Sequence, residues 1–336
     1  MAERATMRDV AALAGVSLKT VSRVVNNEGS VSPDLEARVT RAAEQLRYRH
    51  NIAASNLRSG QRSRAVALLV QDLSNEYSAI LLRAVSDVAR DRGIVVLSAS
   101  LDEEEGRERE LVANFIGRRI DGMIMMPATT DQSYLQPDVA AGFAVVMIDR
   151  EPRGLSADSV VVDNVEGAER ATAHLIRHGH RRIALVSDDP RVVTAQDRRQ
   201  GYERALSASG IALERQLVRS ARTVGGSMDQ VRELLSLDDP PTAIFAARNT
   251  STAGAAISLK RMGKSHLVAL VGFDELQLAE LADPGITTLA QDPAHVGSVA
   301  VGLLLDRLDG QSEPPRVLTL PTALTARGSG EIRPPD

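Results

Sequence analysis

The first residues able to do chemistry lie between positions 17 and 26, where polar side chains alternate with valines. Val21, Val24 and Val25 fall on one face of a helix, which leaves the polar set on the opposite face. There Arg23 can pair with O6 and N7 of guanine, and Lys19 can reach a base edge or a phosphate. The sequence therefore predicts a helix that reads base pairs, its outer face formed by Leu18, Lys19, Thr20, Ser22, Arg23 and Asn26.

Three short helices are expected to position this face. Thr6 and Asp9 have the spacing of a capping box, and Gly15 can end the first helix in a left-handed conformation. Ser17 caps the second helix, and Ser32 precedes a proline that opens the third. Two short helices separated by Gly-Val indicate a helix-turn-helix. A three-helix bundle without a nucleic-acid role has similar caps, so the pattern favours DNA binding without deciding it.

Charge and composition narrow the class of protein. Residues 1–64 carry 11 Lys and Arg against 6 Asp and Glu, whereas the remainder carries 29 against 38. Such a basic head on an acidic body is expected to meet a polyanion, with a chance fluctuation as the alternative. The 336 residues are too many for one typical domain, and the absence of Cys excludes disulfides and thiolate metal sites. No apolar run approaches the roughly 20 residues that span a bilayer, and the N-terminus does not resemble a secretory signal, so we expect a cytoplasmic protein.

Beyond residue 61, short apolar runs alternate with helical patterns, which predicts mostly parallel sheets with helices on both sides. Two such units fit, with a break near Val162 and a return near Gln291. Ligands bind beyond the carboxyl ends of strands in these sheets, so two facing units predict a cleft. The runs expected to be strands buried on both faces are Ala65–Val70, Ile94–Ser98, Gly122–Met126, Ala144–Ile148, Ile183–Val186, Ala243–Ala246 and Leu267–Val271.

The segment Met7–Asn26 resembles the head of the lac repressor (LacI) family of regulators nearly residue for residue, as do Val31–Pro33 and Leu46–Tyr48. The body is similar to that family's effector-binding core, which is itself similar to periplasmic sugar-binding proteins. The resemblance implies a dimeric, sequence-specific repressor of transcription that is controlled by a small-molecule effector. The landmarks in the body are Asp72–Tyr77, Val146–Arg150, Val162–Asn164, His174-Leu175, Gly179–Ile183, Arg198–Tyr202, Val271–Asp274 and Gln291-Asp292.

The same resemblance implies a hinge helix at residues 51–57 that enters the minor groove of DNA. Leu57 stands where relatives have the leucine that wedges open the central base step, and Ala54 is small enough for close approach. His50 stands where the family usually has Pro, either to donate to a phosphate or as a neutral replacement. Beyond the outer face of the second helix, the DNA-binding candidates are Thr6, Ser17, Ser32, Asn51, Ala54 and Leu57.

The expected organisation is an all-α helix-turn-helix headpiece and hinge helix before an α/β body of two Rossmann-like, periplasmic-binding-protein-like subdomains. The headpiece should span 5–50, and the hinge helix and linker 51–61. The first subdomain should comprise 62–162 with about 292–322, and the second 163–291 with about 323–330. The C-terminus has no leucine heptad of the kind that makes some relatives tetrameric, so we expect a homodimer on a pseudopalindromic operator.

Several residues that follow strand ends are candidates for contact with an effector. Asp149 and Asp274 could accept hydrogen bonds from sugar or nucleoside hydroxyls, with a strand-end or capping role as the alternative. The resemblance places Arg198 on the ligand, and an interlobe salt bridge is its alternative. Tyr77 and Phe273 could supply apolar walls, although a core position is equally expected for Phe273. The full set is Tyr77, Asp149, Arg150, Arg198, Arg248, Asn249, Phe273, Asp274 and Gln291.

Arg248 bears on the charge of the effector. Relatives often have Asn or Asp at this position and the next, where this chain has Arg248-Asn249. An arginine that faces Arg198 and Arg150 would favour a sugar acid or sugar phosphate. The competing interpretation is that Arg248 pairs with Asp149 or Asp274.

The remaining polar clusters are expected to be structural. His174 and His178 share a helix face near His180, but no acid stands at ligand spacing, so a structural role is favoured over a metal site. We expect a solvated helix start at 102–105, a charged helix face at 108–119 and a loop at 188–190, with a role in the cleft as the alternative for that loop. The chain shows no catalytic Ser/His/Asp or Cys/His grouping and no phosphate-binding GxxxxGK, so we expect neither an enzyme nor a cofactor. A solute-binding protein, the rival class, would have a signal peptide and no helix-turn-helix.

Overall fold

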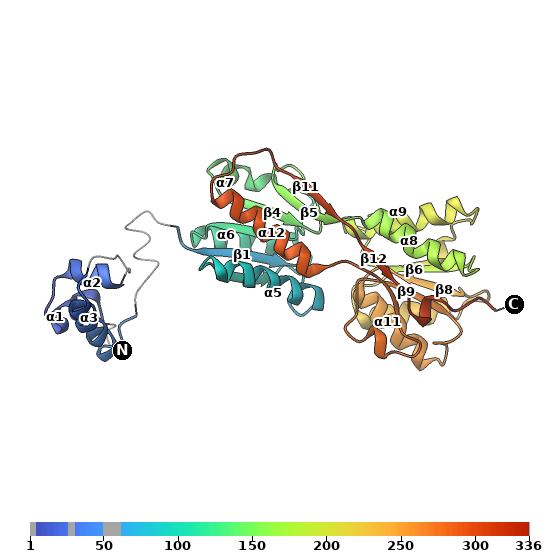
Figure 1. Ribbon diagram of the computed structural model, residues 1–336. Coiled ribbons are helices and arrows are strands. Elements are labelled where there is room, and N and C mark those ends of the chain that lie inside the picture. The colour runs from blue at the N-terminus through green and yellow to red at the C-terminus, as the bar shows by residue number, and fades with distance from the viewer. Residues whose placement is uncertain (1–4, 26–30, 50–61, 336) are drawn as a thin grey trace. The chain divides into compact units, whose positions relative to one another are not determined.

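The computed structural model describes residues 5–25, 31–49 and 62–335 (Figure 1). The chain divides into two compact units, residues 1–63 and 64–336, which are described in turn. Asn26 and the predicted hinge, with His50, Asn51, Ala54 and Leu57, lie outside the described residues.

The described residues of the first unit form three helices, α1 (Met7–Ala14), α2 (Leu18–Val25) and α3 (Pro33–Gln45). The capping box is present, since the Thr6 amide donates to the Asp9 carboxylate at 2.7 Å and the Asp9 amide donates to the Thr6 hydroxyl at 3.4 Å. Gly15 ends α1 with φ 62°, the left-handed conformation that glycine adopts without steric cost. Buried Val10, Val21, Val39 and small alanines join the three helices into one core. The predicted helix-turn-helix is therefore confirmed.

The second unit contains two six-stranded sheets whose strands are parallel except for the pair β10 and β12. The first sheet has the order β11-β5-β4-β3-β1-β2. Its strands are β1 (Ala65–Val70), β2 (Val95–Ser100), β3 (Gly122–Met125), β4 (Ala144–Ile148), β5 (Asp158–Val162) and β11 (Val317–Leu320). The second sheet has the order β12-β10-β9-β8-β6-β7. Its strands are β6 (Ile183–Ser187), β7 (Val218–Ser220), β8 (Ala243–Ala246), β9 (Ala269–Phe273), β10 (Thr287–Ala290) and β12 (Ala323–Thr325).

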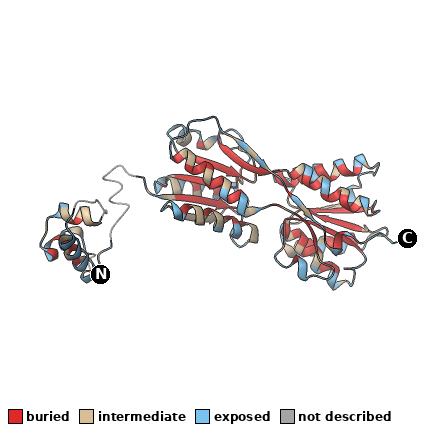
Figure 2. Cartoon of the chain, in the orientation of Figure 1, coloured by how far each residue is buried: buried red, intermediate tan, exposed pale blue. Residues whose placement is uncertain are grey.

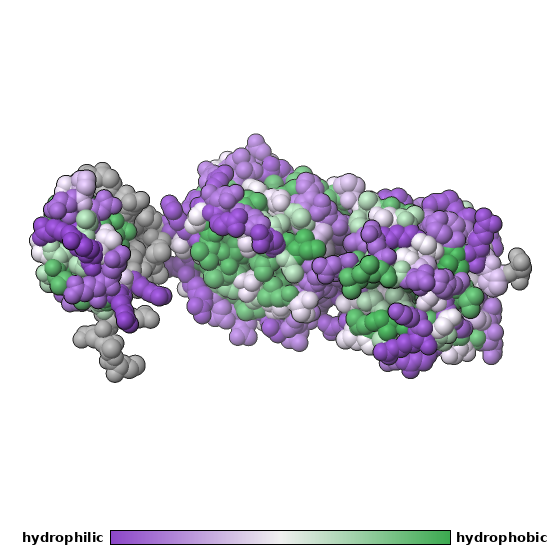
Figure 3. Space-filling model, turned by 60° about the horizontal axis from the view of Figure 1, so that its bottom comes forward, coloured by the Kyte–Doolittle hydropathy of each residue, from purple (hydrophilic) through white to green (hydrophobic). Residues whose placement is uncertain are grey.

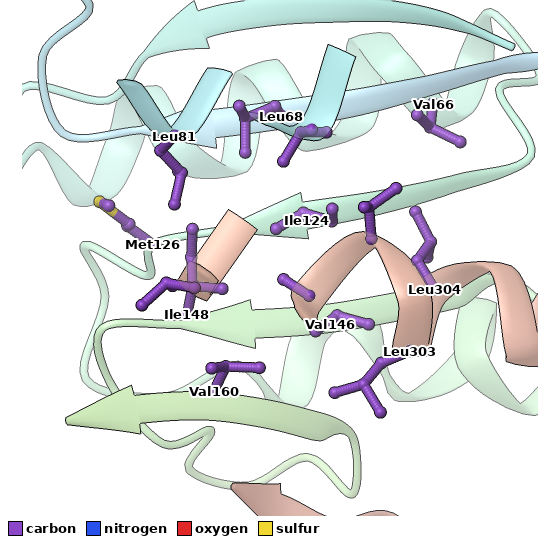
Figure 4. Close-up of a cluster of buried hydrophobic side chains, with 14 of the residues drawn as sticks. Val66, Leu68, Leu81, Ile124, Met126, Val146, Ile148, Val160, Leu303 and Leu304 are labelled. Atoms are coloured by element: carbon purple, nitrogen blue, oxygen red, sulfur yellow. The ribbon is translucent and has the colours of Figure 1, made fainter. Parts of the chain in front are cut away.

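Helices cover both faces of each sheet, as the alternating pattern predicts. On the first sheet, α5 (Glu76–Asp91) and α12 (Pro293–Leu308) pack on one face, and α6 (Glu105–Gly117) and the short α7 (Gln136–Ala140) lie on the other side. On the second, α8 (Asn164–Arg177) and α9 (Val193–Ala208) cover one face, while α10 (Val224–Leu234) and α11 (Asn249–Arg261) cover the other. The strands between them are largely buried (Figure 2). Figure 4 shows one of these cores, in which Leu303 and Leu304 of α12 meet Ile124 and Val146 of the sheet.

The chain changes sheet three times. It leaves the first sheet after β5, returns after β10 into α12, and passes from β11 to β12 at the end (Figure 1). Two of the crossing segments lie side by side, since the Thr322 amide donates to the Asp163 carboxylate at 2.7 Å. Three segments of the chain therefore connect the two halves of the body.

Three expectations about burial are wrong. Leu267 does not belong to a buried strand, because β9 begins at Ala269 and Leu267 is 62% exposed. Ile94–Ser98 does not form a strand buried on both faces, because β2 is the edge of its sheet and Val95 is 60% exposed. Glu108 does not belong to a solvated helix face, because its side chain is fully buried. The Glu108 carboxylate accepts hydrogen bonds from the Thr129 amide at 2.9 Å and the Tyr134 hydroxyl at 2.6 Å. Donors from distant loops therefore explain the burial of this charge.

Asp158 at the start of β5 ties the C-terminal part of the chain to the first sheet. Its buried carboxylate accepts from the Arg307 guanidinium at 2.7 and 3.1 Å and from the Arg316 amide at 2.8 Å. Burial by itself would raise the pKa of Asp158, but these hydrogen bonds and the two guanidinium charges hold it below its usual value. The carboxylate is therefore ionised and paired at neutral pH.

Candidate functional site

The outer face of α2 has the exposure that base reading requires. Leu18 and Lys19 are exposed, and Thr20, Ser22 and Arg23 are partly exposed, while Val21 is buried against the other helices. Ser17 accepts a hydrogen bond from the Thr20 amide at 3.1 Å and so caps α2 as predicted. Thr6 and Ser32 are exposed at the starts of α1 and α3, where Ser32 makes no capping hydrogen bond with its side chain.

A cavity opens where the carboxyl ends of the two sheets meet. It contains about 560 Å³ of empty space, a figure that includes its opening to solvent. The lining comes from the ends of β1, β3 and β4 and the start of α5 on one side, and from the ends of β6, β8, β9 and β10 and the start of α9 on the other. Of the predicted contact residues, those at its wall are Tyr77, Asp149, Arg150, Arg198, Arg248, Asn249, Asp274 and Gln291.

Two aspartates occupy matching places in the two halves. Asp149 follows β4 and Asp274 follows β9, and both have φ 69°. Each amide still donates along its sheet, from Asp149 to the Val160 carbonyl at 3.0 Å and from Asp274 to the Leu289 carbonyl at 2.9 Å. The left-handed turn at each strand end therefore leaves a carboxylate at the wall of the cavity.

The environment of these groups sets their protonation. Burial raises the pKa of Asp149, and the charges of Arg150 and Arg198 oppose that rise. Burial, together with the Asp149 and Asp274 carboxylates, raises the pKa of Tyr77 well above its usual value. The Tyr77 phenol therefore stays neutral at physiological pH and can donate a hydrogen bond.

Arg198 is held within the second half of the body. Its guanidinium donates to the Asn164 side chain and to the Ala247 carbonyl, both at 2.8 Å, and lies 3.7 Å from the centre of the Phe273 ring. The predicted alternative of an interlobe salt bridge is therefore not seen for Arg198. Phe273 is fully buried beneath this guanidinium rather than at the wall, so it supports the arginine instead of forming an apolar face of the cavity.

The other two arginines of the cavity are paired with acids. Arg248 forms an ion pair with Asp188, and their side chains are 11% and 12% exposed. The prediction that Arg248 could pair with Asp149 or Asp274 is wrong in its partner. Arg150 forms a two-pronged pair with Glu103, which lies in the segment expected to be solvated and is instead almost buried.

Neutral amides join the two halves across the cavity. The Asn249 side-chain amide donates to the Asn75 carbonyl oxygen at 2.7 Å, and the reverse contact measures 3.3 Å. Asn75 also accepts from the Tyr77 amide at 3.0 Å and so caps α5. Asn75 lines the cavity although it was not a predicted contact, and Asp188 lines it as the alternative to a plain loop at 188–190 allowed. Glu103, which was not predicted either, lies behind the wall as the partner of Arg150.

These two parts, a helix-turn-helix and a two-sheet body with a polar cleft between its sheets, define a class of DNA-binding proteins with a periplasmic-binding-protein-like body. Residues 6–51 match the family model of bacterial regulatory proteins of the lacI family, and residues 172–330 match the periplasmic binding protein-like domain. The transcriptional regulator GalS of Salmonella typhimurium is 33% identical over 309 residues, which cover 91% of this chain and 90% of that protein. The chain therefore belongs to the LacI family of bacterial transcription regulators. Relatives such as GalS and CytR are transcription regulators and not enzymes.

Solved structures agree with this placement. A lac repressor dimer bound to operator and the anti-inducer ONPF has a TM-score of 0.85 and 25% identity, over 98% of this chain and 99% of that one. A complex of the regulator CelR with cellobiose has a TM-score of 0.71 and 32% identity, over 97% of this chain and all of that one. The repressor CytR of Escherichia coli K12 is 29% identical over 98% of this chain and 97% of its own length. Among the described residues, no helix is both long and apolar enough to cross a membrane.

Proposed function

We propose that the chain is a dimeric repressor that binds a pseudopalindromic operator and responds to a neutral, polyhydroxylated effector, a sugar or a nucleoside, in the cleft. The observation that carries this proposal is the cleft itself, which gathers residues from both halves of a body attached to a helix-turn-helix. The body is taken as two subdomains, 62–162 with about 292–322 and 163–291 with about 323–330. Action on DNA places the protein in the cytoplasm.

The pairing of charges in the cavity supports a neutral effector. Three aspartates and three arginines line the cavity, and a fourth acid, Glu103, binds Arg150 from behind. Arg248 is already paired with Asp188, so an anionic ligand would have to compete with a buried carboxylate. The Asp149 carboxylate, by contrast, suits hydroxyl donors. A neutral effector is consistent with the similar regulator CelR, whose complex contains cellobiose.

An apolar face supports the dimer. Ile80 of α5, Ile257 of α11, Leu278 and Leu281 are exposed, and Leu281 is 81% exposed. The Gln277 amide donates to the Glu76 carboxylate of α5 at 3.3 Å, so the loop with these leucines adjoins that helix. Figure 3 shows hydrophobic patches on both halves of the body in a single view. A second copy of the chain is the occupant that we propose, because exposed apolar patches often mark protein interfaces.

DNA binding and effector response can be measured together by fluorescence anisotropy. The protein is titrated into its own upstream intergenic DNA and into random DNA at one salt concentration, because phosphate contacts make affinity salt-dependent. The DNA complexes are then titrated with matched pairs of neutral and anionic compounds, such as ribose and ribose 5-phosphate or glucose and gluconate. We expect preference for the upstream DNA and a shift in affinity with a neutral compound. A shift only with the anionic member would refute the neutral effector, and equal binding to both DNAs would refute an operator in that region.

The dimer has a separate test by gel filtration with light scattering. Leu281→Asp should convert the dimer to a monomer at micromolar concentration, because it places a charge in the apolar face. Leu213→Asp is the matched control, since Leu213 is also an exposed leucine but lies after α9. A monomeric parent protein, or a tetramer, would contradict the proposal.

A further inference from the structure

Three potential metal ligands come together at the C-terminal end of α8. His174 and His178 are four residues apart, and Glu331 follows the short 3-10 helix η4 (Gly328–Gly330) near the end of the chain. One ligand atom from each of the three residues lies within 4.8 Å of the others. No acid was expected at ligand spacing, but Glu331, more than 150 positions along the chain, supplies one.

The distances match those between ligands of a tetrahedral ion. Nε2 of His174 lies 3.0 Å from one Glu331 carboxylate oxygen, and Nε2 of His178 lies 3.4 Å from the other. Bonds of about 2.0–2.1 Å in tetrahedral zinc sites separate neighbouring ligand atoms by roughly 3.3 Å. The cluster could thus accept an ion with small adjustments of the partly exposed Glu331 side chain.

The two imidazoles are arranged to present Nε2. The Nδ1 atom of His178 lies 2.9 Å from the His174 carbonyl oxygen. A carbonyl can only accept, so Nδ1 carries the proton and Nε2 of the neutral ring keeps its lone pair. Histidines that bind a metal usually donate their other ring N–H to a carbonyl or carboxylate in this way. Nε2 of His174 is buried and has no hydrogen-bond partner, although the Glu331 carboxylate is 3.0 Å away. Because 3.0 Å is within hydrogen-bonding distance, the bond is absent because of its angle. The buried nitrogen is therefore left without a hydrogen bond.

We propose that His174, His178 and Glu331 form a site for a divalent transition metal ion, with Zn²⁺ as the expected occupant. Two imidazole nitrogens and one carboxylate are a usual zinc ligand set, with water in the fourth position on the exposed side. The ion would fasten the C-terminal segment to α8. The neighbouring residue supports this role, because the Ile332 carbonyl accepts from Nε2 of His180 at 2.8 Å and its side chain packs on the core.

The test is isothermal titration of tag-free, EDTA-treated full-length protein with ZnCl₂. We expect one ion per chain with a Kd in the micromolar range or tighter, and at least a tenfold loss of affinity in His178→Ala and Glu331→Gln. His266→Ala is the matched control, because His266 is an exposed histidine that faces Asp283 elsewhere, and it should bind zinc as the parent does. With Co²⁺ in place of zinc, the parent should show the intense visible absorption of a tetrahedral site.

Thermal unfolding separates a metal site from a simple His–Glu contact. Zinc at 100 times Kd should raise the Tm of the parent by roughly 5 °C and leave that of His178→Ala unchanged, while the two proteins should melt within about 2 °C of each other in EDTA. Equal zinc affinity in the parent and His178→Ala would overturn the proposal, as would a parent that binds no zinc. Neither measurement involves DNA or the effector, so its failure is independent of the proposed function.

Discussion

Neutralising Asp188 alone should destabilise the protein more than neutralising Asp188 and Arg248 together. The two side chains form an ion pair and are 12% and 11% exposed, so each is the counter-charge of the other in a place with little water. Two unit charges about 4 Å apart attract by about 4 kcal/mol at an effective dielectric constant of 20. Removing one partner of a buried pair costs about 3–5 kcal/mol, because the other charge stays behind without compensation.

We therefore expect Asp188→Asn and Arg248→Gln each to lower the free energy of unfolding by about 3 kcal/mol, and the double variant by less than either, because it leaves no buried charge without a partner. The coupling free energy would then be about 3 kcal/mol or more. The assay is guanidinium-induced unfolding of the four proteins at pH 7, without effector. The matched control is the exposed pair Arg199 and Glu203 of α9, 2.7 Å apart, whose double-mutant cycle should give about 0.3–0.5 kcal/mol.

The result also bears on the effector. If the effects of the two substitutions simply add, Arg248 is not committed to Asp188 and is free to bind an anion. The neutral effector would then lose its main support. A coupling free energy well above that of the exposed pair would instead show that the cavity satisfies its own charges.

Three further changes have expected outcomes. Asp158→Asn should lower the free energy of unfolding by about 3 kcal/mol at pH 7. Because the pKa of Asp158 is lowered in the folded protein, the parent should keep this advantage above about pH 3.8 and lose it at lower pH, as measured by unfolding at a series of pH values. Gly201→Ala should lower the free energy of unfolding by about 3 kcal/mol in a thermal melt, since its Cβ would lie 2.1 Å from the Val165 carbonyl oxygen of α8. Gly302→Ala is the control, because a Cβ there would have nothing within 4 Å, and it should stabilise the protein by about 0.5–1 kcal/mol. Arg23→Ala should weaken specific DNA binding by about 1–3 kcal/mol, and an equal loss on random DNA in the anisotropy assay would show that Arg23 reads no base.

Much of the fold was predictable because its signals are local. The capping box, Gly15 and the buried valines define the first two helices within about 20 residues, and apolar runs mark most central strands. The strands that were missed have only short or interrupted apolar runs, such as Val160–Val162 of β5. β11 and β12 alternate in exposure at the edges of their sheets, and β5 begins with the charged Asp158, which is buried only because two distant arginines pair with it.

The cavity was predictable in part for a topological reason. Residues that follow parallel strands meet at one edge of a sheet, so Asp149, Arg248 and Asp274 could be expected at the cleft without knowledge of any distance. The ion-pair partners of the cavity arginines could not be predicted in this way. Arg248 and Asp188 are 60 positions apart, and Arg150 and Glu103 are 47 apart, so only the packing of separate elements shows which charges are compensated.

The distribution of these contacts would allow the two halves of the body to move relative to each other. Arg150 and Glu103 both belong to the first half, and Arg248 and Asp188 both belong to the second, so lobe motion need not break either ion pair. The contact between Asn75 and Asn249 that crosses the cavity is made by neutral amides, which exchange readily with water or with ligand hydroxyls. A ligand that replaces it changes the balance between lobe arrangements at little electrostatic cost. Because linkage is reciprocal, DNA that favours one arrangement must change the affinity of the cleft by the same factor.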